Sequence, residues 1–136
     1  MVRDRVHLHL WPQAYVVARL AVVPDLGGRA APAGAPLCLT VGHGEVSLLA
    51  PAETVEGLGV AIQHLERGWR ALTVDTVFPP GTIGVLEAVS TALARIGVPV
   101  MVFSSHDTDH VLVPEAQLGR ALAALNQIDF DRFLRA

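Results

Sequence analysis

The sequence predicts an α+β fold, in which helices pack on antiparallel strands, and three observations support this prediction. Short stretches that alternate apolar and polar residues, the pattern of half-buried strands, recur along the chain. Two of them flank Gly42-His43-Gly44, whose glycines can take the positive φ values of a tight hairpin turn. In the second half, strand and amphipathic helix patterns follow one another in the order β-α-β-β-α.

Length and composition limit the size of the core and the kinds of partner. The 136 residues, of which 51% are hydrophobic and 17% charged, suffice for one ordinary core or for two small halves that share one. The formal net charge is -3 and there is no lysine, so the clustered positive charge that nucleic acid requires is missing. We therefore expect no nucleic-acid partner.

Compartment and membrane association follow from two further features. No stretch is apolar for the ~18 residues that a membrane helix requires, so we expect no membrane partner. The single cysteine, Cys38, excludes an internal disulfide framework, and its apolar neighbours favour a small core residue over a nucleophile. We expect a cytoplasmic protein.

The first half of the chain is dominated by strand patterns. His7 and His9 alternate with apolar residues in the first of them, and the second is rich in β-branched residues. After the hairpin, four apolar residues recur at helical spacing, although Gly57 and Gly59 weaken the helix that they predict. The expected elements are strands over Val6–Trp11 and Tyr15–Val23, a loop over Pro24–Pro36, hairpin strands over Leu37–Val41 and Glu45–Leu49, and a short or irregular helix over Thr54–Leu65.

The second half alternates strands with helices. Its second strand is continuously apolar, which predicts a central strand buried on both faces. Gly97 is placed to end the first helix, and Pro114 to open the second. The expected elements are a strand over Arg70–Phe78, a helix over Ile83–Ile96, strands over Val98–Phe103 and His110–Val113, a helix after Pro114, and a docked apolar tail over Ile128–Phe133.

This order is that of a ferredoxin-like βαββαβ unit without its last strand. A missing edge strand would leave a row of unpaired backbone N–H and C=O groups. We therefore expect either the N-terminal strand or a second subunit to supply it.

The loop before the first of these helices is one candidate site. A helix start presents free backbone N–H groups and partial positive charge, and Gly81 and Gly84 remove the side-chain bulk that would keep a ligand away. This chemistry suits a carboxylate. In the alternative interpretation, Thr82 caps the helix and nothing binds.

The second candidate site is the polar segment Ser104–His110, which directly follows the apolar strand. Open α/β sheets bind ligands beyond the carboxyl ends of their strands, and here Asp107 and Asp109 could hold an ammonium group. The two stretches together would form a receptor for a small zwitterion. Alternatively, the segment is a polar turn whose side chains cap the local backbone.

A metal site is a third possibility for the same segment. His106, Asp107, Asp109 and His110 are all usable zinc or manganese ligands. In an extended segment the two histidines would lie roughly 13 Å apart, too far for one ion, although a turn could bring them together. A metal-dependent activity at His106, Asp109 and His110 therefore remains an alternative.

The sequence carries no motif typical of an enzyme. It has no Ser-His-Asp spacing, nucleophile elbow, Walker loop or Rossmann fingerprint, and Gly81-x-x-Gly84 alone is a weak signal. We accordingly expect no catalytic residues and no cofactor.

Four segments of the chain resemble a known family. They are Glu66-Arg67-Gly68-Trp69-Arg70-Ala71-Leu72-Thr73-Val74, Thr82-Ile83-Gly84-Val85-Leu86, Gly97-Val98-Pro99-Val100 and Ser104-Ser105-His106-Asp107-Thr108-Asp109-His110-Val111-Leu112-Val113. Together they look like the signature of small bacterial ACT-domain proteins, which are similar to the ACT modules of aspartokinases and of animal cytosolic arginine sensors. The resemblance covers nearly the whole chain and is strongest from Gly68 to Leu125.

The resemblance implies a tandem of two ferredoxin-like ACT units, a less regular one over residues 1–65 and a second over residues 66–136. It implies a non-enzymatic regulatory module that binds an amino acid at the interface between units, forms a homodimer and acts on a partner protein. A ligand-free structural or protein-interaction module is the alternative. The ligand-binding candidates carried over from the family are Thr82, Ile83, Gly84, Val85, Leu86, Ser104, Ser105, Asp107, Thr108 and Asp109. The sequence departs from the family pattern at Pro79, Pro80, His106 and His110.

Overall fold

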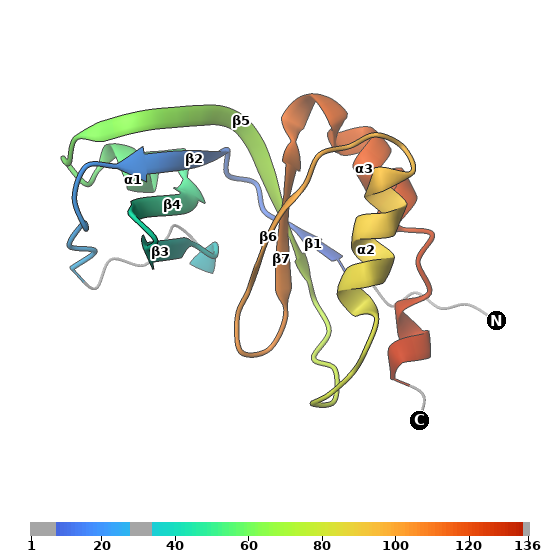
Figure 1. The fold of residues 1–136 in the computed structure, drawn as a ribbon. Helices are drawn as coiled ribbons and strands as arrows, with labels where there is room; N and C mark the ends of the chain where they lie inside the picture. Colours follow the sequence, from blue (N-terminus) through green and yellow to red (C-terminus); the bar gives the residue numbers. More distant parts are fainter. Residues whose placement is uncertain (1–7, 28–33, 135–136) are drawn as a thin grey trace. The chain divides into compact units, whose positions relative to one another are not determined.

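The structure, a computed structural model, describes residues 8–27 and 34–134 and contains two compact units (Figure 1). One unit is Pro12–Arg70; the other combines the described residues before Pro12 with those from Ala71 onward. This division differs from the sequence-based boundary at residue 65 because one long strand, β5 (Ile62–Val74), runs through residue 70, and because the first described residues belong with the C-terminal half. That the first unit is itself an ACT-type unit stays a prediction.

The unit Pro12–Arg70 is a small antiparallel sheet with one short helix. Its strands lie in the order β3-β4-β2-β5, and register shifts interrupt the pairing of β2 with β5. One face of the sheet buries a cluster of apolar side chains, which comprises Val16, Ala18, Leu20, Leu48, Ala50 and Val55. The elements besides β5 are β2 (Tyr15–Leu20), β3 (Cys38–Gly42), β4 (Glu45–Pro51) and α1 (Ala52–Glu56).

The predicted hairpin is confirmed. Strands β3 and β4 pair antiparallel, and Gly42 lies opposite Glu45. The two residues between them, His43 and Gly44, have φ values of 54° and 74°. Positive φ at both central positions is the geometry of a type I′ turn, whose twist matches that of the strands it joins.

The predicted helix over Thr54–Leu65 is wrong beyond Glu56. Helix α1 ends at Glu56, and Gly57 follows as its C-cap. The rest of the predicted segment enters β5, where Ile62 lies opposite Leu20 and Leu65 opposite Ala18 of β2. The apolar residues at helical spacing therefore belong to a short helix and a strand that follows it. The helix ends early because glycine is costly inside a helix.

The other unit is a four-stranded sheet in the order β1-β5-β7-β6, with α2 and α3 on one face (Figure 1). Side chains of the sheet and the helices form one core, which comprises Leu72, Val74, Val89, Leu93, Val98, Val111, Val113, Ala121, Leu125 and Phe130. Phe130 is buried in this core, as expected for a docked apolar tail. The elements besides β5 are β1 (Leu8–Leu10), α2 (Val85–Ala94), β6 (Met101–Ser104), β7 (Asp109–Pro114), η2 (Glu115–Gln117), α3 (Leu118–Leu125) and η3 (Phe130–Phe133).

The N-terminal strand supplies the edge strand that the second half lacks. Strand β1 pairs antiparallel with β5, so that Leu8 lies opposite Val74 and Leu10 opposite Leu72. Both leucines pack against the core beneath the helices. The predicted α+β, ferredoxin-like fold is confirmed, and this unit is complete within one chain.

The predicted burial of the continuously apolar strand is wrong. Strand β6 lies at the edge of the sheet and its residues are only partly buried, whereas β7 lies inside the sheet. Val111, Leu112 and Val113 of β7 are at most 1% exposed. In a βαββα order the hairpin returns its second strand to the middle of the sheet, and an apolar run alone does not show which strand of a hairpin that is.

None of the helices in the described part of the chain is long and apolar enough to cross a membrane.

Candidate functional site

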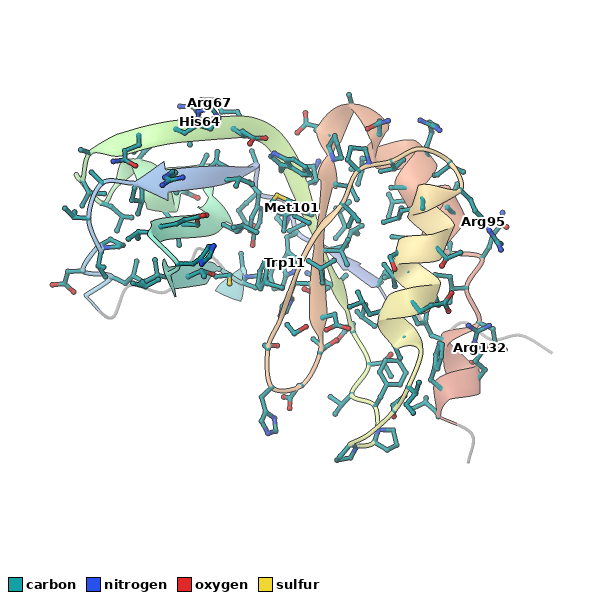
Figure 2. All side chains as sticks on the ribbon, in the orientation of Figure 1. Trp11, His64, Arg67, Arg95, Met101 and Arg132 are labelled. Carbon is teal, nitrogen blue, oxygen red and sulfur yellow. The ribbon has the colours of Figure 1, made fainter. Side chains whose placement is uncertain are left out.

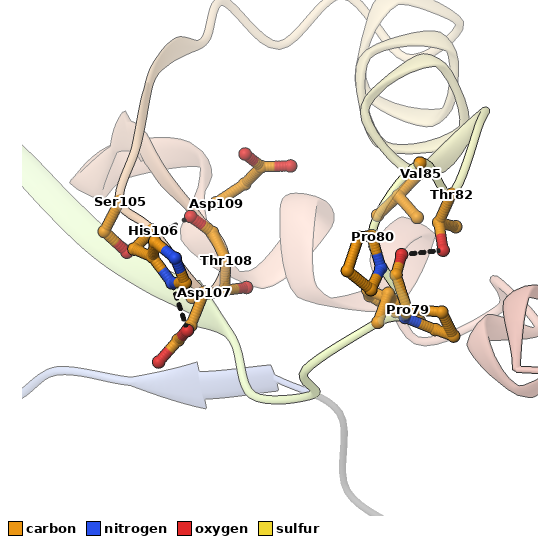
Figure 3. Close-up of a pocket in the computed structure, with 11 residues that line it drawn as sticks. Pro79, Pro80, Thr82, Val85, Ser105, His106, Asp107, Thr108 and Asp109 are labelled. Atoms are coloured by element: carbon orange, nitrogen blue, oxygen red, sulfur yellow. Dashed lines mark hydrogen bonds and ion pairs between the residues drawn. The ribbon is translucent and has the colours of Figure 1, made fainter.

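Two loops of the C-terminal unit face each other across an open hollow of about 230 Å³ (Figure 3). One loop connects β5 to α2, and the other connects β6 to β7. The residues that line the hollow are Phe78, Pro79, Pro80, Gly81, Thr82, Val85, Ser105, His106, Asp107, Thr108 and Asp109. The structure thus brings together the two stretches that the sequence singled out.

The loop before α2 ends in a helix start without a side-chain cap. The N-cap residue is Gly84, with φ of 104°, and no side chain there bonds to the first turn. The Thr82 hydroxyl instead donates a hydrogen bond of 2.6 Å to the Pro79 carbonyl oxygen and closes the turn before the helix. The alternative in which Thr82 caps the helix is therefore wrong, and the first N–H groups of α2 remain a positive pole.

Gly84 is needed at this position for two reasons. Its positive φ is a conformation that residues with a Cβ rarely adopt. A Cβ atom there would also lie 3.3 Å from a ring carbon of Phe133. The close approach of Phe133 therefore also favours a residue without a side chain where α2 begins.

The loop between β6 and β7 is held by hydrogen bonds at both ends. The Ser105 N–H donates to the Thr108 carbonyl oxygen at 2.8 Å, and the Thr108 hydroxyl donates to the Val74 carbonyl oxygen at 2.5 Å. The Ser104 hydroxyl donates to Oδ1 of Asp109, also at 2.5 Å. These bonds are the kind that the alternative of a self-capping polar turn requires. In the described part of the chain, the bond given for the Asp107 carboxylate is to the His106 ring and not to the backbone.

The two histidines of this loop are in different environments. The His106 side chain is 99% exposed and its Nδ1 lies 2.8 Å from Oδ1 of Asp107. His110 is 7% exposed, and both of its ring nitrogens have partners, Thr73 Oγ1 at 2.9 Å and Ser105 Oγ at 3.0 Å. Among the described residues no three His, Cys, Asp or Glu side chains form a group that could hold a metal ion. The structure does not support the metal-site alternative at His106, Asp109 and His110.

The candidate residues divide into those that line the hollow and those that do not. Thr82, Val85, Ser105, Asp107, Thr108 and Asp109 line it, whereas Gly84, Leu86 and Ser104 do not. Ile83 is 89% exposed and lines a neighbouring hollow together with Phe133. The assignment of a ligand to any of these residues stays a prediction.

The electrostatic character of the hollow is negative on one side and positive on the other. Asp107 and Asp109 supply two carboxylates, and the start of α2 supplies the positive pole opposite them (Figure 3). Arg95 and Arg132 lie on the helical side of the unit (Figure 2), and neither lines the hollow. A ligand with one cationic and one anionic end would match this arrangement.

Burial of His110 makes the stability of this unit depend on pH. Desolvation lowers the pKa of His110 below its ordinary value of 6.5, although the neighbouring Asp109 carboxylate opposes the shift. Between the lowered pKa and 6.5 the unfolded chain binds more protons than the folded one, so stability is complete above 6.5 and falls as the pH drops through this window.

This pH dependence can be measured by urea unfolding of the wild type and the His110→Gln variant at several pH values. The difference in unfolding free energy between the two proteins is expected to shrink as the pH falls from 7 toward 5. Other groups titrate equally in both proteins, so a difference that stays constant with pH would contradict a buried, neutral His110.

Part of the chain matches a known domain family, and its fold resembles those of several solved structures. Residues 64–127 match the family model of the ACT domain. No curated protein sequence matches the chain. Among solved structures, a protein from Agrobacterium tumefaciens is similar, with a TM-score of 0.72 and 22% identity over 91% of this chain and 89% of the other.

Two further solved structures share the fold. A protein of unknown function from Vibrio cholerae, described as a possible transport protein, has a TM-score of 0.64 and 22% identity, over 88% of this chain and 86% of the other. The ligand-free regulatory subunit of aspartate kinase from Thermus thermophilus has a TM-score of 0.62 and 16% identity, over 92% of this chain and 98% of the other. At these identities the likeness establishes the fold alone.

Proposed function

Residues 64–127 of this chain match the family model of the ACT domain, and from that premise we propose that the protein is a non-enzymatic regulatory module that binds a free amino acid or a similar small zwitterion. The observation that carries the proposal is the hollow between the two loops. The uncapped start of α2 accepts the carboxylate of the ligand, and Asp107 and Asp109 accept its ammonium group.

The size of the hollow also favours a small ligand. Pockets for drug-sized molecules usually measure about 300–1,000 Å³, and this one measures about 230 Å³. Because the hollow is open, a side chain on the ligand can extend beyond it. The identity of the amino acid would then depend on contacts outside the two loops.

Regulation in this proposal takes place through association. A ligand biases a protein only if it binds one arrangement more tightly than another. We propose that the protein is a cytoplasmic homodimer that transmits such a bias to a partner protein and has no nucleic-acid or membrane partner. Exposed apolar side chains near the start of α2, Val77, Ile83 and Leu86, support a self-association surface.

A thermal-shift screen of the twenty amino acids tests the proposal. A ligand that binds only the folded state stabilises it by mass action, by about 2.7 kcal/mol at a hundred times its Kd. At least one amino acid at millimolar concentration is expected to raise the Tm, with Zn²⁺ and Mn²⁺ as parallel samples. A protein that no amino acid stabilises would instead be a ligand-free interaction module.

A further inference from the structure

A series of three hydrogen bonds, one buried and two partly buried, joins Trp11 to Ser105 in the loop between β6 and β7. The indole Nε1 of Trp11, which lies against the sheet (Figure 2), donates to Thr73 Oγ1 at 2.7 Å. Thr73 Oγ1 lies 2.9 Å from His110 Nδ1, and His110 Nε2 lies 3.0 Å from Ser105 Oγ. The last of these residues, Ser105, lines the hollow.

Which atom donates in each of these hydrogen bonds follows from the donors and acceptors available. An indole N–H can only donate, so Thr73 Oγ1 is an acceptor for Trp11. The hydroxyl proton of Thr73, which is 9% exposed, has one acceptor within the described part of the chain, Nδ1 of His110. A buried hydroxyl proton without an acceptor is costly, so Thr73 donates to Nδ1.

The tautomer of His110 is then determined. Nδ1 accepts a hydrogen bond and carries no proton, so in the neutral ring the proton is on Nε2. Nε2–H donates to Ser105 Oγ, and the Ser105 hydroxyl must direct its own proton elsewhere. Its nearest acceptor within the loop is the Thr108 carbonyl oxygen, at a long 3.3 Å. The Phe103 ring, with its centroid 4.9 Å from that of His110, packs beside the imidazole.

We propose that Thr73 and His110 are positioning residues that make Ser105 a hydrogen-bond donor toward the hollow. The inference rests on the proposed function, because it assigns to Ser105 a role in holding the ligand. The Ser105 hydroxyl would donate a hydrogen bond to an acceptor atom of the ligand, in place of its long bond to the Thr108 carbonyl oxygen. The site would thus favour a ligand that, besides the carboxylate held at the start of α2, places a further acceptor atom such as a side-chain carbonyl oxygen beside Ser105.

The tautomer can be measured without any ligand. In ¹⁵N-labelled protein at neutral pH, a long-range ¹H–¹⁵N correlation spectrum is expected to show His110 Nδ1 at the shift of an unprotonated nitrogen and Nε2 at that of a protonated one. The Thr73→Val variant keeps the shape of the side chain but lacks the hydroxyl, so the two nitrogens are expected to move toward intermediate shifts. Thr73→Ser, which keeps the hydroxyl, is expected to restore the wild-type spectrum.

Two results would overturn the inference: a proton on Nδ1 in the wild type, or a Thr73→Val spectrum that is the same as that of the wild type. Any amino acid that stabilises the protein gives a second readout, since Thr73→Val should bind it about tenfold more weakly, the equivalent of one hydrogen bond, and Thr73→Ser should not. If no amino acid binds, the proposed function fails, while the imidazole spectrum still decides the tautomer.

Discussion

A chain shortened to begin at Pro12 is expected to lose the folded C-terminal unit. The deletion removes β1, whose Leu8 and Leu10 pack against the core and whose backbone pairs with β5. Complete burial of a leucine side chain contributes about 1.5–3 kcal/mol, so these two partly buried leucines together contribute roughly 2 kcal/mol or more. The exposed edge of β5 adds unpaired backbone groups. Set against a total stability of about 5–15 kcal/mol, this loss is large.

Circular dichroism and urea unfolding of the shortened chain measure the effect. A peptide of residues 1–11, added in trans, is expected to restore helical signal and stability, whereas a scrambled peptide of the same composition is not. If the shortened chain kept the unfolding midpoint of the full chain, β1 would not be the fourth strand of this unit.

The Asp109→Asn variant is expected to weaken amino-acid binding by about 10- to 100-fold. Asparagine keeps the shape of the side chain and can still accept the bond from Ser104, but it removes the negative charge that faces the ligand. A hydrogen bond between charged groups contributes about 1.5–3 kcal/mol, which corresponds to this range. The fold should be preserved, because Asp109 is the first residue of β7 and is only partly buried, outside the core of the unit.

Isothermal titration with the amino acid that stabilises the wild type most provides the measurement. Asp75→Asn is the matched control, since Asp75 is an exposed aspartate of the same unit that does not line the hollow. Equal affinities of the Asp109→Asn variant and the control would show that the ammonium group binds elsewhere.

Local sequence patterns predicted much of the fold. The Gly42-His43-Gly44 turn and the helix that became α2 were evident because turn geometry and helical spacing are properties of a few neighbouring residues. The helix predicted over Thr54–Leu65 and the buried position of β6 were wrong. Gly57 and Gly59 signalled the early end of that helix locally, but its continuation as β5 depends on pairing with β2. The position of β6 depends on which strand lies beside which, and no local pattern records that.

The two candidate loops were also recognisable from the sequence, but the hydrogen bonds from the strands that hold Ser105 in place were not. Ser105 and Asp109 stood out as polar residues after an apolar strand, and Gly84 as a helix start. The partnership of Thr73 with His110 joins residues 37 positions apart and depends on the alignment of β5 with β7. A threonine within an apolar strand was the only sequence signal, and it is equally typical of an ordinary β-strand.

The most direct test of amino-acid binding in the hollow is an amide chemical-shift titration of ¹⁵N-labelled protein with each of the twenty amino acids. At least one is expected to shift the amide signals of Gly81, Thr82, Ser105 and Asp109 first, and to do so saturably. Shifts confined to the unit Pro12–Arg70, or no saturable shift with any amino acid, would contradict binding at this site.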